Sequence, residues 1–523
     1  MTGEFGATVG EYRGTVPALL RRAVERHSDR EWIRTDDLVL TFGQAAGRVG
    51  GIARDLAAAG VGRGDLVMLT ARTTPEYLLT WLALASLGAL SVPVNPASTP
   101  SELGGLLAQV GPGLLVTDGP LEAVVGQALE RAAAGGGSDR EPAISHVEDL
   151  FSGAPAALPE TTVTPDDLLI LIPTSGTTGR SKLVIQTHRA YAMAAEGFPH
   201  WMGLTEADRL LTCLPLFHVN APAYSALGSL ACGAGLVLLP RFSASGFLDA
   251  ARRHGATEFN AIGAMLEILM RQPERPDDAD SPLWLCYTGP APERARQEEM
   301  ERRFGLRIVV GYALSESPYG LIWSHGSRPF GTLGMVRQHP YLGTINEAKL
   351  TDPETGTTLG TGETGELLLR NPVLTPGYWG MPDETAAILA DGWLRTGDLV
   401  TANPDGTYTF VGRLKEVLRR RGENLSPLEV QDVLDAHPAV LESAVVGVES
   451  ELGEEEIKAF VVAVPGALLD FAELRAWAAE RLSPFKVPRF FQLIEELPRT
   501  PTARIAKHRL PTGHRDGEWD AEA

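Results

Sequence analysis

The chain has 523 residues, of which 44% are hydrophobic and 21% charged, so its composition is that of a folded globular protein and excludes a disordered one. Its formal net charge of -20 disfavours binding to nucleic acid or to an anionic membrane surface. The three cysteines, Cys213, Cys232 and Cys286, lack metal-ligand spacing, and their odd number favours a reducing cytoplasm over a disulfide framework.

Neither a targeting segment nor a membrane span is predicted. Residues 1–6 have no basic region followed by an apolar run, which a signal peptide would need. The most apolar stretch, 77–94, is interrupted by Gly88 and Pro93, and a buried helix running into a strand is the better interpretation. We therefore expect a cytoplasmic protein with no nucleic acid or membrane partner. Monomer and homodimer both remain open.

Apolar helical patterns alternate with short strand-like runs along most of the chain. A helix is expected to end at 56–60, followed by a strand at 66–69, a helix at 78–87 and a strand at 90–94. Another strand is expected at 169–172. This alternation predicts βαβ units and a mostly parallel sheet, and thus an α/β fold.

The C-terminal region has a different pattern and is predicted to be a separate, smaller domain. A hairpin-like run ends at Val411, and a boundary is expected between Gly412 and Arg421. The elements predicted beyond it make a compact α+β pattern: a helix at 429–437, strands at 440–448 and 459–464, and a helix at 471–482.

The strand at 169–172 leads into a loop rich in glycine, serine and threonine that ends in a lysine. Gly176 and Gly179 let the backbone N–H groups turn inward without a Cβ clash, and Lys182 adds a positive charge, so the loop suits an anion with several oxygens. A plain surface turn is the alternative, and the spacing is not that of a Walker A loop. The loop comprises Thr174, Ser175, Gly176, Thr177, Thr178, Gly179, Arg180, Ser181 and Lys182.

Four further motifs follow this loop in a fixed order. They are Leu-Pro-Leu-Phe-His-Val-Asn at 214–220, Gly-Tyr-Ala-Leu-Ser-Glu at 311–316, Trp-Leu-Arg-Thr-Gly-Asp at 393–398, and Gly-Arg-Leu-Lys with Arg-Gly-Glu-Asn between 412 and 424. Together with the loop they resemble the signature of the adenylate-forming superfamily of acyl-CoA synthetases, nonribosomal peptide adenylation domains and luciferases. The match is most similar to the carnitine/crotonobetaine–CoA ligase-like branch and runs over nearly the whole chain.

The resemblance implies a site for ATP and Mg²⁺. Tyr312 would pack on adenine, Glu316 would hold Mg²⁺ through carboxylate oxygen, and Asp398 would accept hydrogen bonds from the ribose hydroxyls. Arg413 would lie near the ribose and the phosphates. Taken singly, these acids would more often be solvated surface residues; the shared order of the motifs favours the functional interpretation. The other nucleotide-site residues implied are Gly289, Pro290, Ala291, Gly311, Ala313 and Ser315.

The resemblance also implies a substrate pocket beside the nucleotide. His218 matches a histidine that gates the acyl pocket in the ligase branch, although a lone histidine after an apolar run is more often structural. The segments 221–224 and 259–265 are expected to line the same pocket, and their small, apolar side chains suit a modest organic substrate. The predicted pocket residues are His218, Val219, Asn220, Ala223, Tyr224, Gly263 and Ala264.

The chain departs from the family pattern near its C-terminus. Where the family has a catalytic lysine, this chain has Arg504, and Lys507 is predicted to be too far along to replace it. Arginine keeps the charge but is a broad planar fork, so the exchange is not conservative at a tight site. The residues predicted to act in catalysis are Arg504, Glu316, His218 and Lys182.

The resemblance further implies that the small domain is mobile. Lys415 occupies the hinge position, about which the domain would rotate between two half-reactions. The predicted organisation is an N-terminal ATP- and substrate-binding domain of parallel and mixed sheets with helices at 1–411, a hinge at 412–416, a mobile C-terminal domain at 417–512, and an acidic tail at 513–523 that is expected to be disordered.

Three functions are compatible with these residues. The leading hypothesis is an ATP-dependent ligase that activates a small aryl or short-chain carboxylate as acyl-AMP and transfers the acyl group to coenzyme A. A second is an ATP-dependent diazotase that activates nitrite, for which Arg504 would make chemical sense. A third is a non-catalytic nucleotide-binding protein, but the presence of Glu316, Asp398 and Lys182 argues against it.

Overall fold

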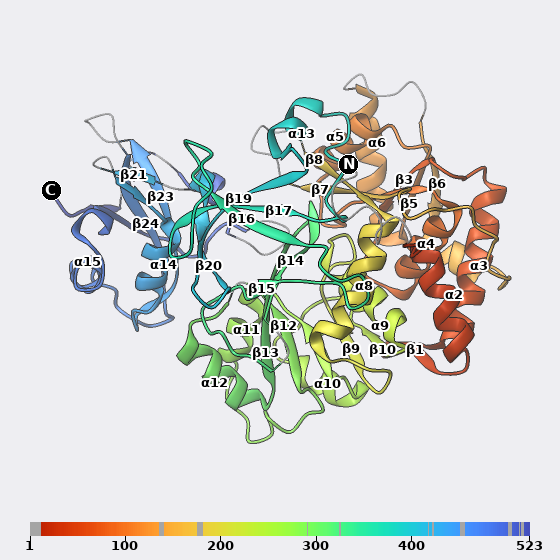
Figure 1. Ribbon diagram of the computed structural model, residues 1–523, viewed down its shortest axis with the longest axis horizontal. Helices are drawn as coiled ribbons and strands as arrows, with labels where there is room; N and C mark the ends of the chain where they lie inside the picture. Colours follow the sequence, from red (N-terminus) through yellow and green to blue (C-terminus); the bar gives the residue numbers. More distant parts are fainter. Residues whose placement is uncertain are drawn as a thin grey trace. The chain divides into compact units, whose positions relative to one another are not determined.

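The computed structural model describes residues 12–134, 141–174, 181–289, 291–323, 326–416, 418–420, 423–449, 455–499, 505–511, 513 and 517–522. The chain forms two compact units (Figure 1). The first comprises Met1–Ala348 and Leu369–Leu394, and the second comprises Lys349–Leu368 and Arg395–Ala523. The predicted α/β class, with mixed sheets and helices in a large N-terminal part, is confirmed.

A six-stranded sheet lies in the first unit, in the order β6-β5-β3-β4-β7-β8. All neighbours are parallel except β7 and β8, which form an antiparallel hairpin. The predicted strands at 66–69, 90–94 and 169–172 correspond to β3, β4 and β7. The strands are β3 (Leu66–Thr70), β4 (Leu90–Pro93), β5 (Leu114–Thr117), β6 (Ala143–His146), β7 (Leu168–Thr174) and β8 (Lys182–Thr187).

A nine-stranded sheet also lies in this unit, in the order β15-β14-β13-β12-β11-β9-β10-β1-β2. Its six central strands are parallel, and antiparallel strands close both edges. The strands are β1 (Glu31–Arg34), β2 (Val39–Thr41), β9 (Arg209–Thr212), β10 (Gly235–Leu238), β11 (Glu258–Asn260), β12 (Leu285–Thr288), β13 (Arg307–Leu314), β14 (Ser317–Ile322) and β15 (Met335–Val336).

Helices cover these sheets, and α4 shows how the sequence sets their limits. The Thr74 side chain accepts a hydrogen bond from the N–H of Tyr77 at the start, and Gly88 ends the helix in the left-handed conformation (φ 72°). The helices of the first unit are α2 (Val16–His27), α3 (Phe42–Ala58), α4 (Pro75–Leu87), α5 (Pro100–Val110), α6 (Glu122–Ala134), α7 (Val147–Ser152), α8 (His188–Met202), α9 (Leu227–Cys232), α10 (Phe247–His254), α11 (Gly263–Met270), α12 (Arg294–Phe304) and α13 (Pro382–Ile388).

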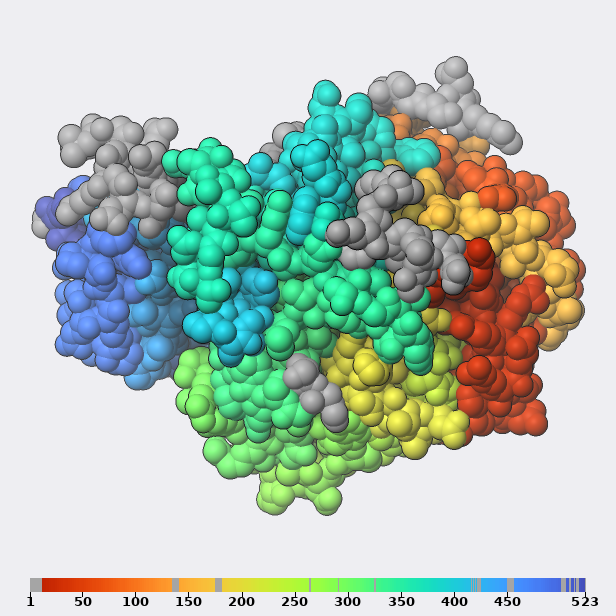
Figure 2. Space-filling model, in the orientation of Figure 1, coloured from red at the N-terminus to blue at the C-terminus, as the bar shows by residue number. Residues whose placement is uncertain are grey.

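Helices far apart in the sequence pack together in this unit. Helix α2 packs against α8 and α9, and Figure 2 shows the red N-terminal region beside the yellow region that contains them. Within the described residues, no helix is both long and apolar enough to cross a membrane. The apolar stretch 77–94 instead contains most of α4 and all of β4, as predicted.

A five-stranded sheet runs in the order β16-β17-β19-β18, with β20 paired to β19. The hairpin predicted before Val411 is the β19–β20 pair, whose turn contains Asn403 and Gly406. The strands are β16 (Glu347–Thr351), β17 (Thr364–Arg370), β18 (Leu389–Ala390), β19 (Trp393–Ala402) and β20 (Tyr408–Arg413).

The C-terminal part of the second unit is a small α+β structure. A four-stranded sheet, in the order β23-β24-β25-β26, packs against α14, and α14 packs against α15. A short 3₁₀ turn, η3 (Leu414–Glu416), and the hairpin of β21 (Leu418–Arg420) and β22 (Glu423–Leu425) precede it. Its elements are α14 (Pro427–Asp435), β23 (Val440–Glu449), β24 (Glu455–Ala463), α15 (Phe471–Ala479), β25 (Phe490–Leu493) and β26 (Glu518–Asp520).

The expectation of a disordered tail is wrong for residues 518–520. They form β26, which pairs antiparallel with β25. Trp519 packs against Phe491 with ring centres 5.8 Å apart, so an apolar anchor holds a segment whose composition is mostly polar. Lys458 on β24 is fully buried and forms an ion pair with Glu518, which explains how an acidic residue of this segment is held in the interior.

Candidate functional site

The ends of the predicted phosphate loop come from the β7–β8 hairpin. Thr174 and Lys182 are opposite each other in the strand register, and the Thr174 hydroxyl donates to the Lys182 carbonyl at 3.3 Å. Ser181 is held by Gln109, whose side chain donates to its carbonyl at 3.0 Å. The hairpin thus brings both ends of the loop together. The loop residues Ser175, Gly176, Thr177, Thr178, Gly179 and Arg180 lie outside the described residues.

Glu316 lies in the turn between β13 and β14, and this turn is fixed from two sides. The buried side chain of Gln186 on β8 donates to the Ser315 carbonyl at 2.7 Å. The backbone N–H of Thr375 donates to the Glu316 carbonyl at 2.7 Å. Both contacts hold the backbone of this turn, and neither uses the Glu316 carboxylate.

Tyr378 connects Lys182 and Glu316 and was not predicted from the sequence. Its hydroxyl donates to Glu316 Oε1 at 2.9 Å, and Lys182 Nζ lies 4.6 Å from the centre of its ring. Burial, together with the nearby Glu316 carboxylate, raises the pKa of Tyr378, so its hydroxyl remains a donor. The segment is placed by pairing with β8, where Val184 and Tyr378 form an antiparallel bridge.

The wall predicted to receive adenine is closely packed. A Cβ on Gly289 would lie 2.5 Å from the Gly311 carbonyl, so only glycine allows the end of β12 to approach β13 here. Tyr312, two-thirds along β13, is partly exposed, as are Ala291 and Ala313. The predicted residues Gly289, Gly311 and Tyr312 are thus brought together; Pro290 lies outside the described residues.

The predicted acyl-pocket segment ends in an uncommon helix. Residues Ala221–Ala226 form the π-helix η2, an element found mostly as short insertions at functional sites. Before it, His218, Val219 and Asn220 are partly exposed, whereas Ala223 and Tyr224 are buried. The buried Asn260 on β11 donates through Nδ2 to Asn220 Oδ1 at 2.7 Å, a contact that the sequence did not predict. Gly263 and Ala264 begin α11, and nothing is described of the Ala264 side chain.

In the second unit, two predicted residues are cross-strand neighbours. Asp398 on β19 is opposite Arg413 on β20, and Arg413 Nε lies 3.1 Å from Asp398 Oδ1. Glu366 on β17 was missed by the sequence analysis, yet its buried carboxylate accepts from the Gly397 N–H at 3.2 Å and forms an ion pair with Arg395. A glutamate inside an apolar strand was the available signal. It fixes the part of β19 that carries Asp398.

Two predicted features of the C-terminal region fall largely outside the described residues. Arg504 is one, and the Lys415 side chain is another, although the backbone of Lys415 lies in η3. Next to it, Glu416 pairs with Lys507 at 3.3 Å. Burial lowers the pKa of Lys507, and the Glu416 carboxylate opposes this effect. The expected hinge residues are therefore tied to the segment that carries Lys507.

Among the described residues, no group of three or more histidine, cysteine, aspartate or glutamate side chains could hold a metal ion. Within these residues, Glu316 therefore does not belong to a ready-made cluster of three metal ligands. Mg²⁺ is typically held by one or two carboxylates together with substrate phosphates and water, so one carboxylate beside a phosphate loop suits this ion.

Comparison with known proteins identifies the family. The model of the AMP-binding enzyme family matches residues 20–379, and that of the AMP-binding enzyme C-terminal domain matches residues 429–504. The sulfoacetate–CoA ligase of Cupriavidus necator is 32% identical over 517 residues, covering 96% of this chain and 98% of the relative. The crotonobetaine/carnitine–CoA ligase of Salmonella heidelberg is 30% identical over 467 residues, covering 86% of this chain and 89% of the relative.

A solved structure agrees with these relatives. The o-succinylbenzoate CoA synthetase of Bacillus subtilis, in complex with its acyl-adenylate intermediate, has a TM-score of 0.83 and 26% identity, covering 96% of this chain and 99% of that one. The fold is that of a nucleotide-using α/β enzyme, and the chain belongs to the AMP-binding enzyme family.

The predicted superfamily is therefore confirmed, as is an enzyme that uses ATP and releases AMP and pyrophosphate. The relatives are coenzyme A ligases, which supports the leading functional hypothesis and the use of coenzyme A. They give no support to the diazotase or to the non-catalytic alternative.

Proposed function

We propose that this enzyme activates a small organic acid as its acyl-adenylate and transfers the acyl group to coenzyme A, with Mg²⁺ as the metal. The observation that carries the proposal is the contact of Tyr378 with both Lys182 and Glu316. It supports the proposal because a cation and a carboxylate then share one tyrosine close to the end of a hairpin whose loop has the composition of a phosphate cradle.

In the first half-reaction, an oxygen of the substrate carboxylate attacks the α-phosphorus of ATP, and the bond to the β-phosphate oxygen breaks. The products are acyl-AMP and pyrophosphate. Lys182 would balance negative charge on the departing phosphates, and Glu316 would hold the Mg²⁺, which supplies further charge neutralisation when bound. Tyr312 would pack on adenine, and Asp398 with Arg413 would contact the ribose. The protein's contribution is positioning and electrostatic stabilisation.

In the second half-reaction, the thiol sulfur of coenzyme A attacks the acyl carbon, AMP leaves, and the thiol proton is released. We assign residues 412–416 as a hinge between an N-terminal domain at 1–411 and a C-terminal domain at 417–512, and Arg504 as the basic residue that meets the carboxylate and α-phosphate. The contact between Glu416 and Lys507 supports this assignment, because it couples the hinge turn to the segment that follows Arg504.

The substrate is proposed to be a small aryl or short-chain acid. Sulfoacetate, crotonobetaine and o-succinylbenzoate are the acids in the names of the relatives, and all carry a polar or charged group besides the activated carboxylate. His218, Val219 and Asn220 would line the pocket, with His218 as its gate. The acidic composition and three free cysteines suit a cytoplasmic monomer or homodimer.

A screen of pyrophosphate release with aryl, fatty and short acids, each with and without coenzyme A, tests this function. An active acid should give pyrophosphate, and adding coenzyme A should yield AMP and a thioester of the expected mass. If coenzyme A never changes the product, the ligase proposal is wrong.

Variants at the contact between Tyr378 and Glu316 provide a more specific test. Glu316→Gln should lower kcat/KM for ATP by about a hundredfold or more, since one charged ligand is lost at the phosphates. Tyr378→Phe removes only the hydroxyl and should cost about tenfold, because Glu316 would be less well oriented. Tyr408→Phe, on β20 and without a role in this contact, serves as the matched control and should leave kcat/KM unchanged. Equal activity of Glu316→Gln and the wild type would contradict the assignment.

A further inference from the structure

Arg337 follows β15 and is enclosed in the first unit, with 1% of its surface exposed. Its Nε donates to the Leu321 carbonyl at 3.0 Å, its Nη1 donates to the Tyr224 hydroxyl at 3.3 Å, and its Nη2 donates to the Tyr287 hydroxyl. The guanidinium carbon lies 4.9 Å from the centre of the Trp201 ring. The cation is thus held by a carbonyl, two phenols and an indole.

All of these partners are neutral. Within the described residues, Arg337 forms no ion pair with an aspartate or glutamate, and its hydrogen bonds engage only part of the guanidinium. An arginine cannot give up its proton to escape burial, and a buried charge is ordinarily paired because desolvation is so unfavourable. Phenols and a carbonyl hold the side chain in place without cancelling its charge. A full positive charge therefore remains in the interior.

This charge lies directly behind residues of the site. Tyr224 belongs to η2, which begins right after Asn220 in the proposed acyl pocket. On another side, a Cβ on Gly311 would lie 2.2 Å from Arg337 Nη2, so the backbone that leads into Tyr312 passes immediately over the guanidinium. Arg337 therefore contacts both Tyr224, one of the predicted pocket residues, and the strand of the predicted adenine wall.

We infer that the uncompensated charge of Arg337 makes the enzyme selective for acids that carry a second negatively charged group besides the carboxylate that is activated. The inference rests on the proposed function, because it takes residues 218–224 as a wall of the acyl pocket. The substrate class is then a short or aromatic acid with an additional carboxylate or sulfonate. Arg337 is enclosed, so it acts through the field across the pocket wall and as a specificity-determining residue, without a direct contact in this state.

The expected size of the effect is large enough to measure. Opposite charges separated by about 7 Å at an effective dielectric constant of about 20 attract strongly enough to change affinity by about tenfold to a hundredfold. A neutral group in the same place would gain nothing from this attraction.

The test uses pairs of acids in which a methyl group is replaced by a charged group: propionate and sulfoacetate, butyrate and succinate, and 4-methylbenzoate and terephthalate. Pyrophosphate release at saturating ATP gives kcat/KM for each acid. The wild type should prefer the dianion of its best pair by about tenfold or more. Arg337→Gln should reduce this ratio by at least about tenfold, and Arg337→Lys, which retains the charge, should keep most of it.

The ratio is measured within one preparation, so partial loss of folded protein cancels. Arg303→Gln is the matched control, because Arg303 is also nearly buried but is paired with Asp278, and its ratio should equal that of the wild type. A wild type without preference for dianions overturns the inference even if Arg337→Gln does not fold. An Arg337→Gln variant that keeps the wild-type ratio shows a purely structural arginine and also overturns it. If no acid releases pyrophosphate, the proposed function itself has failed.

Discussion

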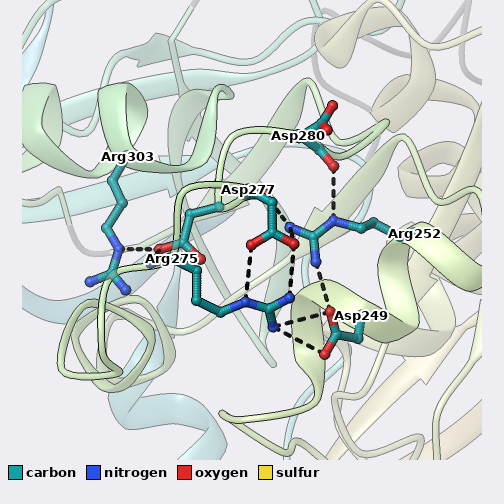
Figure 3. A network of polar contacts seen from close by, with 7 residues as sticks. Asp249, Arg252, Arg275, Asp277, Asp280 and Arg303 are labelled. Carbon is teal, nitrogen blue, oxygen red and sulfur yellow. Dashed lines mark hydrogen bonds and ion pairs between the residues drawn. The ribbon is translucent and has the colours of Figure 1, made fainter.

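Two sets of cationic side chains in the first unit differ in their partners. Beside α10 and α12, a surface network pairs its arginines with carboxylates: Figure 3 shows Arg275 between Asp249 and Asp277, with ion-pair distances of 3.1 and 2.8 Å. Lys182 and Arg337, by contrast, form no ion pair with a carboxylate within the described residues and instead face aromatic rings.

The difference indicates what each set is for. The paired arginines tie the segment 271–281 to α10 and α12, and their charges are already neutralised by the protein. An aromatic face orients a cation but leaves its charge in place. Lys182 and Arg337 therefore still have a charge that could attract an incoming anion; we propose a triphosphate at the first and a second substrate charge at the second.

The largest expected effect comes from removing an unpaired cation. Lys182→Met should lower kcat/KM for ATP by about a hundredfold to a thousandfold, because it removes the charge that we propose to balance the leaving phosphates. Its unfolding midpoint in urea should stay near that of the wild type, since no carboxylate among the described residues loses an ion-pair partner. Steady-state kinetics and urea denaturation check both parts. A strong loss of stability with unchanged kinetics would show that Lys182 serves the fold and not the binding of ATP.

Removing a paired and buried cation should do the opposite. Arg303→Met leaves the Asp278 carboxylate, 4% exposed, without the guanidinium that lies 2.8 Å away, and should cost about 3 kcal/mol of unfolding free energy. The kcat/KM of the protein that remains folded should be unchanged. Urea denaturation with active-site titration measures both. A change in substrate preference would place Arg303 among the functional cations.

The buried Glu258 extends the comparison of paired and unpaired charges to an acid. Within the part of the chain that the structure describes, neither of its carboxylate oxygens has a hydrogen-bond partner, and burial raises its pKa well above the usual value. The folded state then keeps the proton to higher pH than the unfolded state, so stability falls as pH rises above about 4.3, the unfolded pKa. Glu258→Gln removes the titrating group, so the stability of the variant should not fall with pH for this reason. The change in unfolding free energy on substitution should therefore be more favourable at pH 8 than at pH 5, by on the order of 1 kcal/mol. Thermal melts at the two pH values measure this, and parallel pH profiles would show that Glu258 does not titrate as stated.

The smallest effect is expected at the surface. Arg275 and its partners Asp249 and Asp277 are all exposed, so salt and water already weaken their attraction. Arg275→Gln should leave the melting temperature nearly unchanged, and any difference should shrink further in 1 M salt. A large shift that persists in high salt would mean that this network carries more of the fold than its exposure indicates.

The sequence predicted elements well where one segment carries its own signal. The runs that became β3, α4 and β4 have the periodicity of buried elements, and the motif around Glu316 is contiguous. Tyr378 could not be found in this way, because it reaches Lys182 and Glu316 only through pairing with β8, almost two hundred residues earlier.

The burial of the charged Arg337 could not be predicted from the sequence either. A lone arginine after a short strand is expected at the surface, and only the packing of Tyr224, Tyr287 and Trp201 around it encloses the side chain. The prediction of a disordered tail failed for a related reason. Its composition indicated a solvated segment, but β26 is held by the packing of Trp519 and by the ion pair between Glu518 and the buried Lys458.

The pairing of Lys458 with Glu518 also sets an order for biosynthesis. A ribosome that adds about 5–20 residues per second needs several seconds to travel from one residue to the other. During that time β24 can pair with β23, but the ammonium group at its centre has not met its carboxylate partner and β25 has a bare edge. The nascent C-terminal sheet is then open to pairing with another chain, and its last strand closes that opening.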